Sequence, residues 1–253
     1  MRSVVRALAA AALVLLAACA VPARAEPLLR DWAVVVVAAD QTSSQGTLTE
    51  GFDNARRELS AALLAKGATP ANLRQFSVDP ARDRATLPAP ARPGEIDRAL
   101  AALTRTARGG CLLYFTSHGD PSGIVMSDGQ FSPAEMDALA DRHCDGRPTV
   151  IVVSACYSGA FVPALAAPER LVLTAARRDR SSFGCGQNDR MPYFDQCVLE
   201  ALPDAADFGV LGGQARACVA ELERRGRLRP ASEPQLYAGP EMKALLPLLR
   251  FDR

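Results

Sequence analysis

The sequence lacks several features that would assign a function from composition alone. Its 253 residues carry a formal net charge of only +1, with basic residues standing singly or in short arginine runs, which argues against a nucleic-acid-binding surface. The only histidines are His118 and His143, and no Cys-x-x-Cys pair occurs, so the ligand spacing of a structural zinc site is absent. No internal repeat is visible, and no apolar run is long enough to span a bilayer as a helix.

The first apolar run is typical of a targeting signal. Two arginines precede the run Ala7–Ala18, as in a secretory signal peptide. Two cleavage sites compete: Leu16-Ala17-Ala18-Cys19 resembles a bacterial lipoprotein box, in which Cys19 becomes the lipid-modified amino terminus, whereas Ala23-Arg24-Ala25 resembles an ordinary signal-peptidase site. Both alternatives predict an exported bacterial protein, either in the periplasm or anchored to the outer membrane by a lipid on Cys19.

Residues 26–253, which follow a signal peptide over residues 1–25, are expected to form one domain of alternating strands and helices. Continuous apolar runs predict strands buried on both faces, and short links favour a mostly parallel sheet of about six strands between two helical layers, an α/β fold of three-layer α-β-α type. The expected strands lie at 32–39, 72–78, 170–176 and 235–237 and in the apolar runs that open segments 111–119 and 149–159. The longer helices are expected at 50–67, 95–108, 132–143, 192–202 and 207–225. The proline-rich segment 80–93 is expected to be a surface loop, and 123–131 a small hairpin.

Two of these strands are followed by side chains that can perform chemistry. His118 follows the run that begins at Cys111, and Cys156 follows the run that begins at Thr149. In parallel sheets, functional residues gather beyond the carboxyl ends of the strands. If the two strands are neighbours, an imidazole and a thiol come together as the base and the nucleophile of a cysteine enzyme. The alternative is that Cys156 is an ordinary buried cysteine and that His118 only hydrogen-bonds a loop.

Glycine next to the histidine supports the catalytic interpretation. With no side chain at Gly119, its backbone N–H can approach a substrate carbonyl and form an oxyanion hole with the N–H of Cys156. Ser158 is a second possible nucleophile, but no Gly-x-Ser-x-Gly elbow surrounds it.

Export favours disulfide bonds among the remaining cysteines, because exported proteins fold in an oxidising compartment. Six cysteines remain after Cys19, so if Cys156 stays a thiol at most two bridges form and one other thiol stays free. Cys111 opens one core strand, and Cys144 precedes the next parallel strand, which places both at the amino-terminal edge of the sheet, away from Cys156. We therefore predict a Cys111–Cys144 disulfide. The pairing of Cys185, Cys197 and Cys218 remains open.

Three segments resemble consecutive blocks of the legumain family, the asparaginyl endopeptidases of the caspase–haemoglobinase clan. They are Phe115-Thr-Ser-His-Gly119, Ser154-Ala-Cys-Tyr-Ser-Gly159 and Thr174-Ala-Ala-Arg-Arg-Asp-Arg-Ser-Ser-Phe-Gly-Cys-Gly186. The resemblance implies a caspase-like fold, a protein or peptide substrate and no cofactor. It also implies a His118–Cys156 dyad with Gly119 at the oxyanion hole, and a primary pocket that includes Ser181, Ser182 and Asp195.

The chain also departs from the family pattern. Ser117 stands where the family has an aspartate before the histidine, and Ser154 stands where it has a pocket glutamate. The loss of acidic groups predicts relaxed specificity, with small polar residues accepted beside asparagine. The sequence thus favours an exported cysteine endopeptidase. The alternatives are a transamidase that uses the same dyad and a non-catalytic envelope lipoprotein that keeps the fold.

Overall fold

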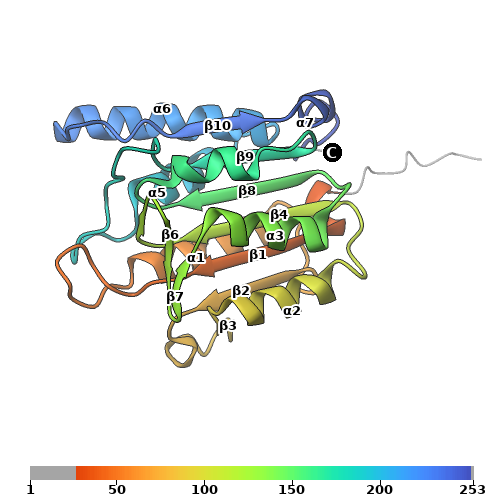
Figure 1. The fold of residues 1–253 in the computed structure, drawn as a ribbon, viewed down its shortest axis with the longest axis horizontal. Coiled ribbons are helices and arrows are strands. Elements are labelled where there is room, and N and C mark those ends of the chain that lie inside the picture. The colour runs from red at the N-terminus through yellow and green to blue at the C-terminus, as the bar shows by residue number, and fades with distance from the viewer. Residues whose placement is uncertain (1–26, 252–253) are drawn as a thin grey trace, which may run out of the picture.

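Seven strands form one central sheet in the computed structural model, which describes residues 27–251 (Figure 1). The predicted signal peptide and Cys19 lie outside the described residues. In the order of their positions across the sheet, the strands are β10 (Gln235–Ala238), β9 (Arg170–Thr174), β8 (Thr149–Ser154), β4 (Gly110–Thr116), β1 (Trp32–Ala38), β2 (Leu73–Ser77) and β3 (Ala89–Pro90). All neighbours are parallel except β10, which runs antiparallel to β9. The predicted α/β fold with a mostly parallel sheet is confirmed.

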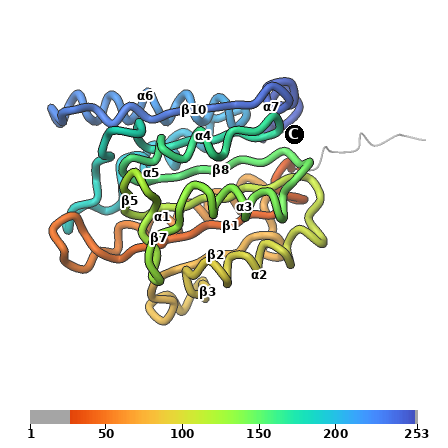
Figure 2. Tube along the Cα trace, viewed as in Figure 1, coloured from red at the N-terminus to blue at the C-terminus, as the bar shows by residue number. Residues whose placement is uncertain are grey.

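Helices cover both faces of the sheet, as Figures 1 and 2 show. Residues of α1 (Gly51–Ala65), α5 (Tyr193–Ala201) and α6 (Phe208–Gly226) pack with alternate strand residues such as Val34 and Val36 on one face. Residues of α2 (Pro93–Leu103), α3 (Pro133–Cys144) and α4 (Val162–Leu165) pack with Val35 and Val37 on the other. Both sets of strand residues are buried, which explains the unbroken apolar runs. No helix in residues 27–251 is long and apolar enough to cross a membrane.

Shorter elements complete the described chain. They are α7 (Pro240–Leu245), the 3-10 helices η1 (Leu28–Asp31), η2 (Pro80–Arg82) and η3 (Ser158–Phe161), and a separate small sheet of β5 (Gly119–Asp120), β6 (Gly123–Met126) and β7 (Gly129–Phe131). The expected hairpin at 123–131 is formed by β6 and β7, which pair antiparallel. Because β5 pairs with β6, this small sheet begins directly after His118.

Two elements differ from the sequence-based expectation. The proline-rich segment contributes β3, a seventh strand, at the edge of the sheet, where the missing N–H of Pro90 removes no bond to a further strand. The helix expected over 95–108 ends at Leu103. After that point the Thr104 hydroxyl donates to the Leu100 carbonyl and the Thr106 hydroxyl donates to the Leu103 carbonyl. These threonine side chains compete for the helix carbonyls and favour a turn over another helical turn.

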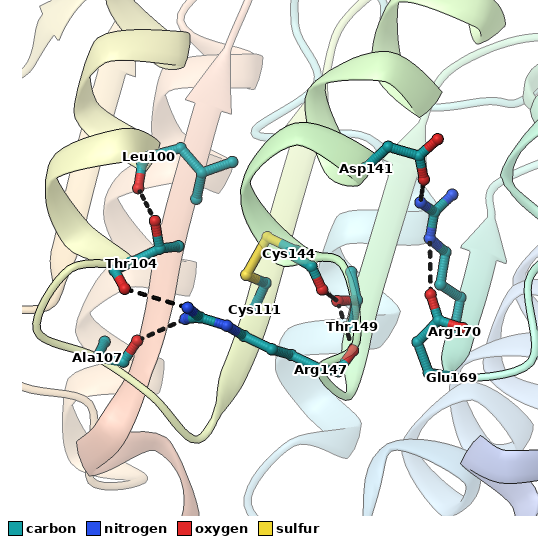
Figure 3. The surroundings of a disulfide bond; sticks show 10 residues. All are labelled: Leu100, Thr104, Ala107, Cys111, Asp141, Cys144, Arg147, Thr149, Glu169 and Arg170. Carbon is teal, nitrogen blue, oxygen red and sulfur yellow. Dashed lines mark hydrogen bonds and ion pairs between the residues drawn. A yellow bond between two sulfur atoms is a disulfide. The ribbon is translucent and has the colours of Figure 1, made fainter.

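The predicted disulfide between Cys111 and Cys144 is present, with Cα atoms 6.1 Å apart. Figure 3 shows that it joins the start of β4 to the end of α3. A second disulfide joins Cys197 of α5 to Cys218 of α6, with Cα atoms 5.6 Å apart. Among the described residues, Cys156 and Cys185 are the free cysteines. The Cys111–Cys144 bridge therefore lies at the amino-terminal edge of the sheet, and the free Cys156 follows the opposite end of β8.

The Cys111–Cys144 disulfide closes a loop with a sequence separation of 33 residues. A loop of this length restricts the unfolded chain enough to stabilise the fold by about 3–4 kcal/mol. We expect the double variant Cys111→Ala/Cys144→Ala to lose about this free energy of unfolding, measured by urea denaturation against the wild type. Peptide mapping of unreduced wild-type protein provides the check on pairing, and recovery of both cysteines as free thiols would contradict the prediction.

Candidate active site

The register of two neighbouring strands brings His118 and Cys156 together. Strands β4 and β8 are adjacent and parallel, and Thr116 lies opposite Ser154. His118 and Cys156 each follow this pair by two residues, so both leave the sheet at the same edge. Next to them, the Ser117 N–H donates to the Ser154 carbonyl at 3.0 Å and continues the strand pairing. The two side chains line one cavity of about 430 Å³.

The His118 ring is held by the loop that follows β1. Its Nε2 lies 2.8 Å from the carbonyl oxygen of Thr42, and the ring of Phe52 packs edge-on at a centroid distance of 5.1 Å. A carbonyl oxygen only accepts hydrogen bonds, so Nε2 carries the proton in this arrangement. In the neutral ring Nδ1 then has the free lone pair. The structure thus makes Nδ1 the basic atom of His118.

The Cys156 side chain is held by the segment that follows β9. Its Sγ accepts a hydrogen bond from the N–H of Ser182 at 3.3 Å, and the Ser182 hydroxyl lies 3.5 Å away. The Ser182 N–H therefore points at the sulfur and fixes its position. The residue is half-buried, at the wall of the cavity. Its surroundings therefore suit a nucleophile that a ligand can reach.

A tight turn follows Cys156. Tyr157 adopts a left-handed backbone conformation with φ of 56°, and its N–H donates to the Arg180 carbonyl at 2.8 Å. This φ is unfavourable for any residue other than glycine, so the hydrogen bond helps to stabilise a strained backbone conformation at Tyr157. A Cβ at Gly159 would lie 2.5 Å from the backbone nitrogen of Arg178, so a larger residue there would push the two segments apart.

Gly119 packs closely against the backbone of Cys156. A Cβ at this position would lie 2.9 Å from the Cys156 carbonyl oxygen and 3.1 Å from the Cβ of Ala155. Only glycine allows this approach without a shift of the backbone. The two residues proposed from the sequence to supply oxyanion-hole N–H groups are therefore neighbours in space.

The other sequence-predicted site residues separate into two groups. Ser181 and Ser182 line the cavity, but Ser154 and Asp195 do not. Asp195 is completely buried on α5, where its carboxylate accepts hydrogen bonds from Tyr114 and Thr116, each at 2.6 Å. Ser154 is buried at the end of β8, where its hydroxyl opposes the rise in the pKa of Asp195 that burial causes. The structure thus places Asp195 in the interior beside β4 and not on the cavity wall, and its part in substrate recognition stays a prediction.

Asp189 is the carboxylate that the structure places on the cavity wall. Its Oδ2 accepts the N–H of Gly186 at 2.7 Å, which closes a short turn. The sequence already offered a signal for it, since Asp189 lies in the polar segment 177–190, beyond the carboxyl end of a buried strand. The remaining wall residues not predicted from the sequence are Ser44, Gln45, Phe183, Gly184, Cys185, Gly186, Tyr193 and Leu228.

Two hydrogen bonds fasten the loops on either side of the cavity to each other. The Ser44 N–H donates to the Cys185 carbonyl at 2.8 Å, and the Gln187 N–H donates to Gln45 Oε1 at 2.9 Å. Because Thr42 of the first loop also orients His118, these bonds connect the wall of the cavity to the position of the His118 ring. In the described part of the chain, no cluster of three His, Cys, Asp or Glu side chains could hold a metal ion.

Comparison with known proteins agrees with this architecture. Residues 97–207 match the sequence model of the Peptidase C13 family, and this segment includes His118, Cys156 and the Ser181–Ser182 pair. The fold is similar to the crystal structure of caspase-1 from Spodoptera frugiperda, with a TM-score of 0.60 and 15% sequence identity over 82% of this chain and 86% of that chain. At that identity the similarity concerns the fold alone. A search of curated proteins found no match. The chain thus has a segment that matches the Peptidase C13 family and a fold similar to that of a caspase.

Burial of Asp195 generates a prediction about stability. Loss of hydration raises the pKa of this carboxyl from 3.8 to about 6, although the hydrogen bonds from Thr116 and Tyr114 oppose the shift. The folded state therefore binds this proton more tightly than the unfolded state does. The contribution of Asp195 to the free energy of unfolding is highest below about pH 4 and falls by about 3 kcal/mol in total as the pH rises toward 6.

The test compares urea unfolding of the wild type and Asp195→Asn at pH 4, 5, 6 and 7. We expect the free energy of unfolding of the wild type, relative to that of the variant, to fall between pH 4 and 6 and then to stay level. Taking the difference between the two proteins removes the contribution of other carboxyls. Parallel pH dependences for the two proteins would contradict the assigned protonation.

Proposed function

We propose that this protein is a cysteine endopeptidase that cleaves peptide bonds through a thioester intermediate. The observation that carries the proposal is the pairing of β4 with β8, which places His118 and Cys156 at equivalent positions on the wall of one cavity. The match of residues 97–207 to the Peptidase C13 family supports it, because the matched segment contains both residues.

The reaction begins with a substrate peptide in the cavity. His118 Nδ1 takes the proton of the Cys156 thiol, and the thiolate attacks the carbonyl carbon of the scissile peptide bond. The carbonyl oxygen becomes an oxyanion, which the N–H groups of Gly119 and Cys156 stabilise. Nδ1 then gives its proton to the leaving nitrogen, the C–N bond breaks, and the amine product departs from the thioester.

Water completes the cycle. Nδ1 takes a proton from a water molecule that attacks the thioester, and the second oxyanion collapses with release of the Cys156 sulfur. The carboxylic acid product leaves, and the thiol regains its proton. The Thr42 carbonyl contributes at both steps, because its hydrogen bond with Nε2–H strengthens when the imidazole becomes positively charged.

The cavity wall favours a polar, uncharged side chain at the cleaved position. Ser181, Ser182 and Gln45 offer hydrogen-bond donors and acceptors, and the Asp189 carboxylate accepts from an amide while repelling an acidic side chain. Ser154 is buried and interacts with Asp195, so a glutamate there would add a second carboxylate to that buried region. The amino-terminal signal pattern supports action outside the cytoplasm, in the periplasm or at the outer membrane.

Single substitutions test the dyad. Cys156→Ala removes the nucleophile and is expected to abolish peptide hydrolysis, whereas His118→Ala is expected to lower kcat/KM by about 10²- to 10⁴-fold, the usual contribution of a positioned base. The readouts are hydrolysis of a fluorogenic peptide library and circular dichroism for folding. Ser158→Ala is the matched control, since it removes the neighbouring hydroxyl. Hydrolysis that survives in Cys156→Ala but is lost in Ser158→Ala would refute the assigned nucleophile.

A further inference from the structure

Two chain segments lie side by side along one rim of the catalytic cavity. The Arg177 N–H donates to the Ser232 carbonyl at 2.8 Å, and the Arg177 guanidinium pairs with Glu233 at 2.8 Å, so residues 177–182 and 227–233 are in contact. Both segments also supply the cavity wall, through Ser181, Ser182 and Leu228. Figure 1 shows the loop after β9 and the carboxyl end of α6 at the same end of the molecule as the loop after β1.

This rim carries an excess of positive charge. The two segments hold five arginines against two acidic residues, a balance of +3, although the whole chain has a formal net charge of only +1. Arg177 is engaged by Asp179 and Glu233, and Arg180 lies 4.0 Å from Glu233. The three others, which we call the arginine rim, are Arg178, Arg227 and Arg229. They are exposed, and among the described residues their guanidinium groups have no hydrogen-bond or ion-pair partner.

The backbone that carries Arg227 and Arg229 is fixed. Helix α6 ends at Gly226 and is capped by Arg227. The left-handed conformation of Arg227 (φ 52°) lets the next N–H, that of Leu228, donate to the Glu223 carbonyl at 2.9 Å. The Glu223 side chain, only 4% exposed, accepts the Ser232 N–H at 3.1 Å. Arg227 and Arg229 therefore flank Leu228, a wall residue of the cavity, on a loop held at both ends.

We propose that the arginine rim binds acidic residues of the peptide substrate that flank the cleaved position. An extended peptide rises about 3.3 Å per residue, so side chains a few positions from the one in the cavity reach past Leu228. Guanidinium groups pair well with carboxylates, and unpartnered ones lose no existing ion pair when they bind. This inference rests on the proposed peptidase function and adds a substrate class to it, namely peptides with acidic flanks.

A peptide of this kind fits the rim better than a membrane or a nucleic acid. The three arginines border a cavity that receives a peptide, and the basic residues elsewhere in the sequence are scattered. Membrane surfaces and nucleic acids are recognised by broader positive patches.

The first test uses three peptides with the same cleaved residue. One carries two glutamates on the amino side, one carries two glutamates on the carboxyl side, and one carries glutamines at all four positions. We expect the wild type to favour one glutamate peptide over the glutamine peptide by about 5- to 10-fold in kcat/KM at low ionic strength. The ratio should shrink toward one as salt rises, because exposed ion pairs are screened. Equal rates for all three peptides at low salt would overturn the proposal.

Substitution then locates the preference. In Arg227→Gln/Arg229→Gln the glutamate-to-glutamine ratio is expected to fall below about twofold. The matched control is Arg105→Gln/Arg216→Gln, which removes the same charge from exposed arginines in other parts of the molecule and should keep the wild-type ratio. Equal losses in both variants would show a general charge effect and refute the rim. If the rim variant binds anionic lipid vesicles more weakly than the wild type does but keeps the wild-type peptide ratio, the rim recognises membranes and the proposal is refuted.

Peptide binding to Cys156→Ala separates the two proposals. The quantity compared is the affinity for the glutamate peptides relative to the affinity for the glutamine peptide. This variant lacks the nucleophile, so its affinity, followed by fluorescence anisotropy, reports recognition without chemistry. A glutamate preference in binding with no hydrolysis by the wild type would support the rim and refute the peptidase. Hydrolysis by the wild type with no glutamate preference in either measurement would support the peptidase and refute the rim.

Discussion

The hydrogen-bonded register between β4 and β8 is the constraint on which the site depends. Because Thr116 lies opposite Ser154, His118 and Cys156 follow their strands at the same level of the sheet. Side chains alternate between the two faces of a strand, so a slip of one residue would turn one of the pair toward the other helical layer. The buried residues on both faces of β4 and β8 resist such a slip, since each would leave its own core cluster. The packing of the core thus sets the geometry of the dyad.

The two edges of the sheet have different roles. At the amino edge, the Cys111–Cys144 disulfide joins β4 to α3 and consumes thiols that would otherwise compete in an oxidising compartment. At the carboxyl edge, loops from different parts of the chain surround the Cys156 thiol and are connected by hydrogen bonds. The Thr42 carbonyl orients His118, the proposed base, and the Ser182 N–H contacts Cys156, the proposed nucleophile. A covalent bridge thus lies at one edge of the sheet, and the left-handed Tyr157 lies at the other.

Much of this architecture could be predicted from the sequence because it is encoded locally. Unbroken apolar runs located the central strands, and the residues just beyond them located His118 and Cys156. The position of Cys111 and Cys144 relative to those strands also indicated their disulfide. The sequence left the pairing of Cys197 with Cys218 open. This pairing depends on how α5 packs against α6, and no local sequence pattern predicts the packing of two helices.

The acidic residues near the cavity show what the sequence does not encode locally. Asp195 was chosen by resemblance, but it lies on the buried side of α5 between Phe194 and Cys197, where Tyr114 and Thr116 satisfy its carboxylate. Asp189 reaches the cavity because a turn closed by its own bond to Gly186 presents it. Which of two nearby acids faces a cavity depends on the loop conformation, and the spacing of residues alone does not determine it. The two-residue strand β3 escaped prediction for a similar reason, since its pairing with β2 is a tertiary contact.

The most direct test of the account is to map which thiol reacts with a peptide-based electrophile. Both Cys156 and Cys185 are free and line the same cavity, so they compete for one probe. Burial raises the pKa of the Cys185 thiol, and the nearby Cys156 adds to the shift, so Cys185 stays protonated and unreactive. A peptidyl acyloxymethyl ketone applied to the folded protein, followed by peptide mass spectrometry, should label Cys156 alone, and His118→Ala should prevent the labelling. Labelling of Cys185 in place of Cys156, or labelling of Cys156 that does not depend on His118, would contradict the proposed dyad.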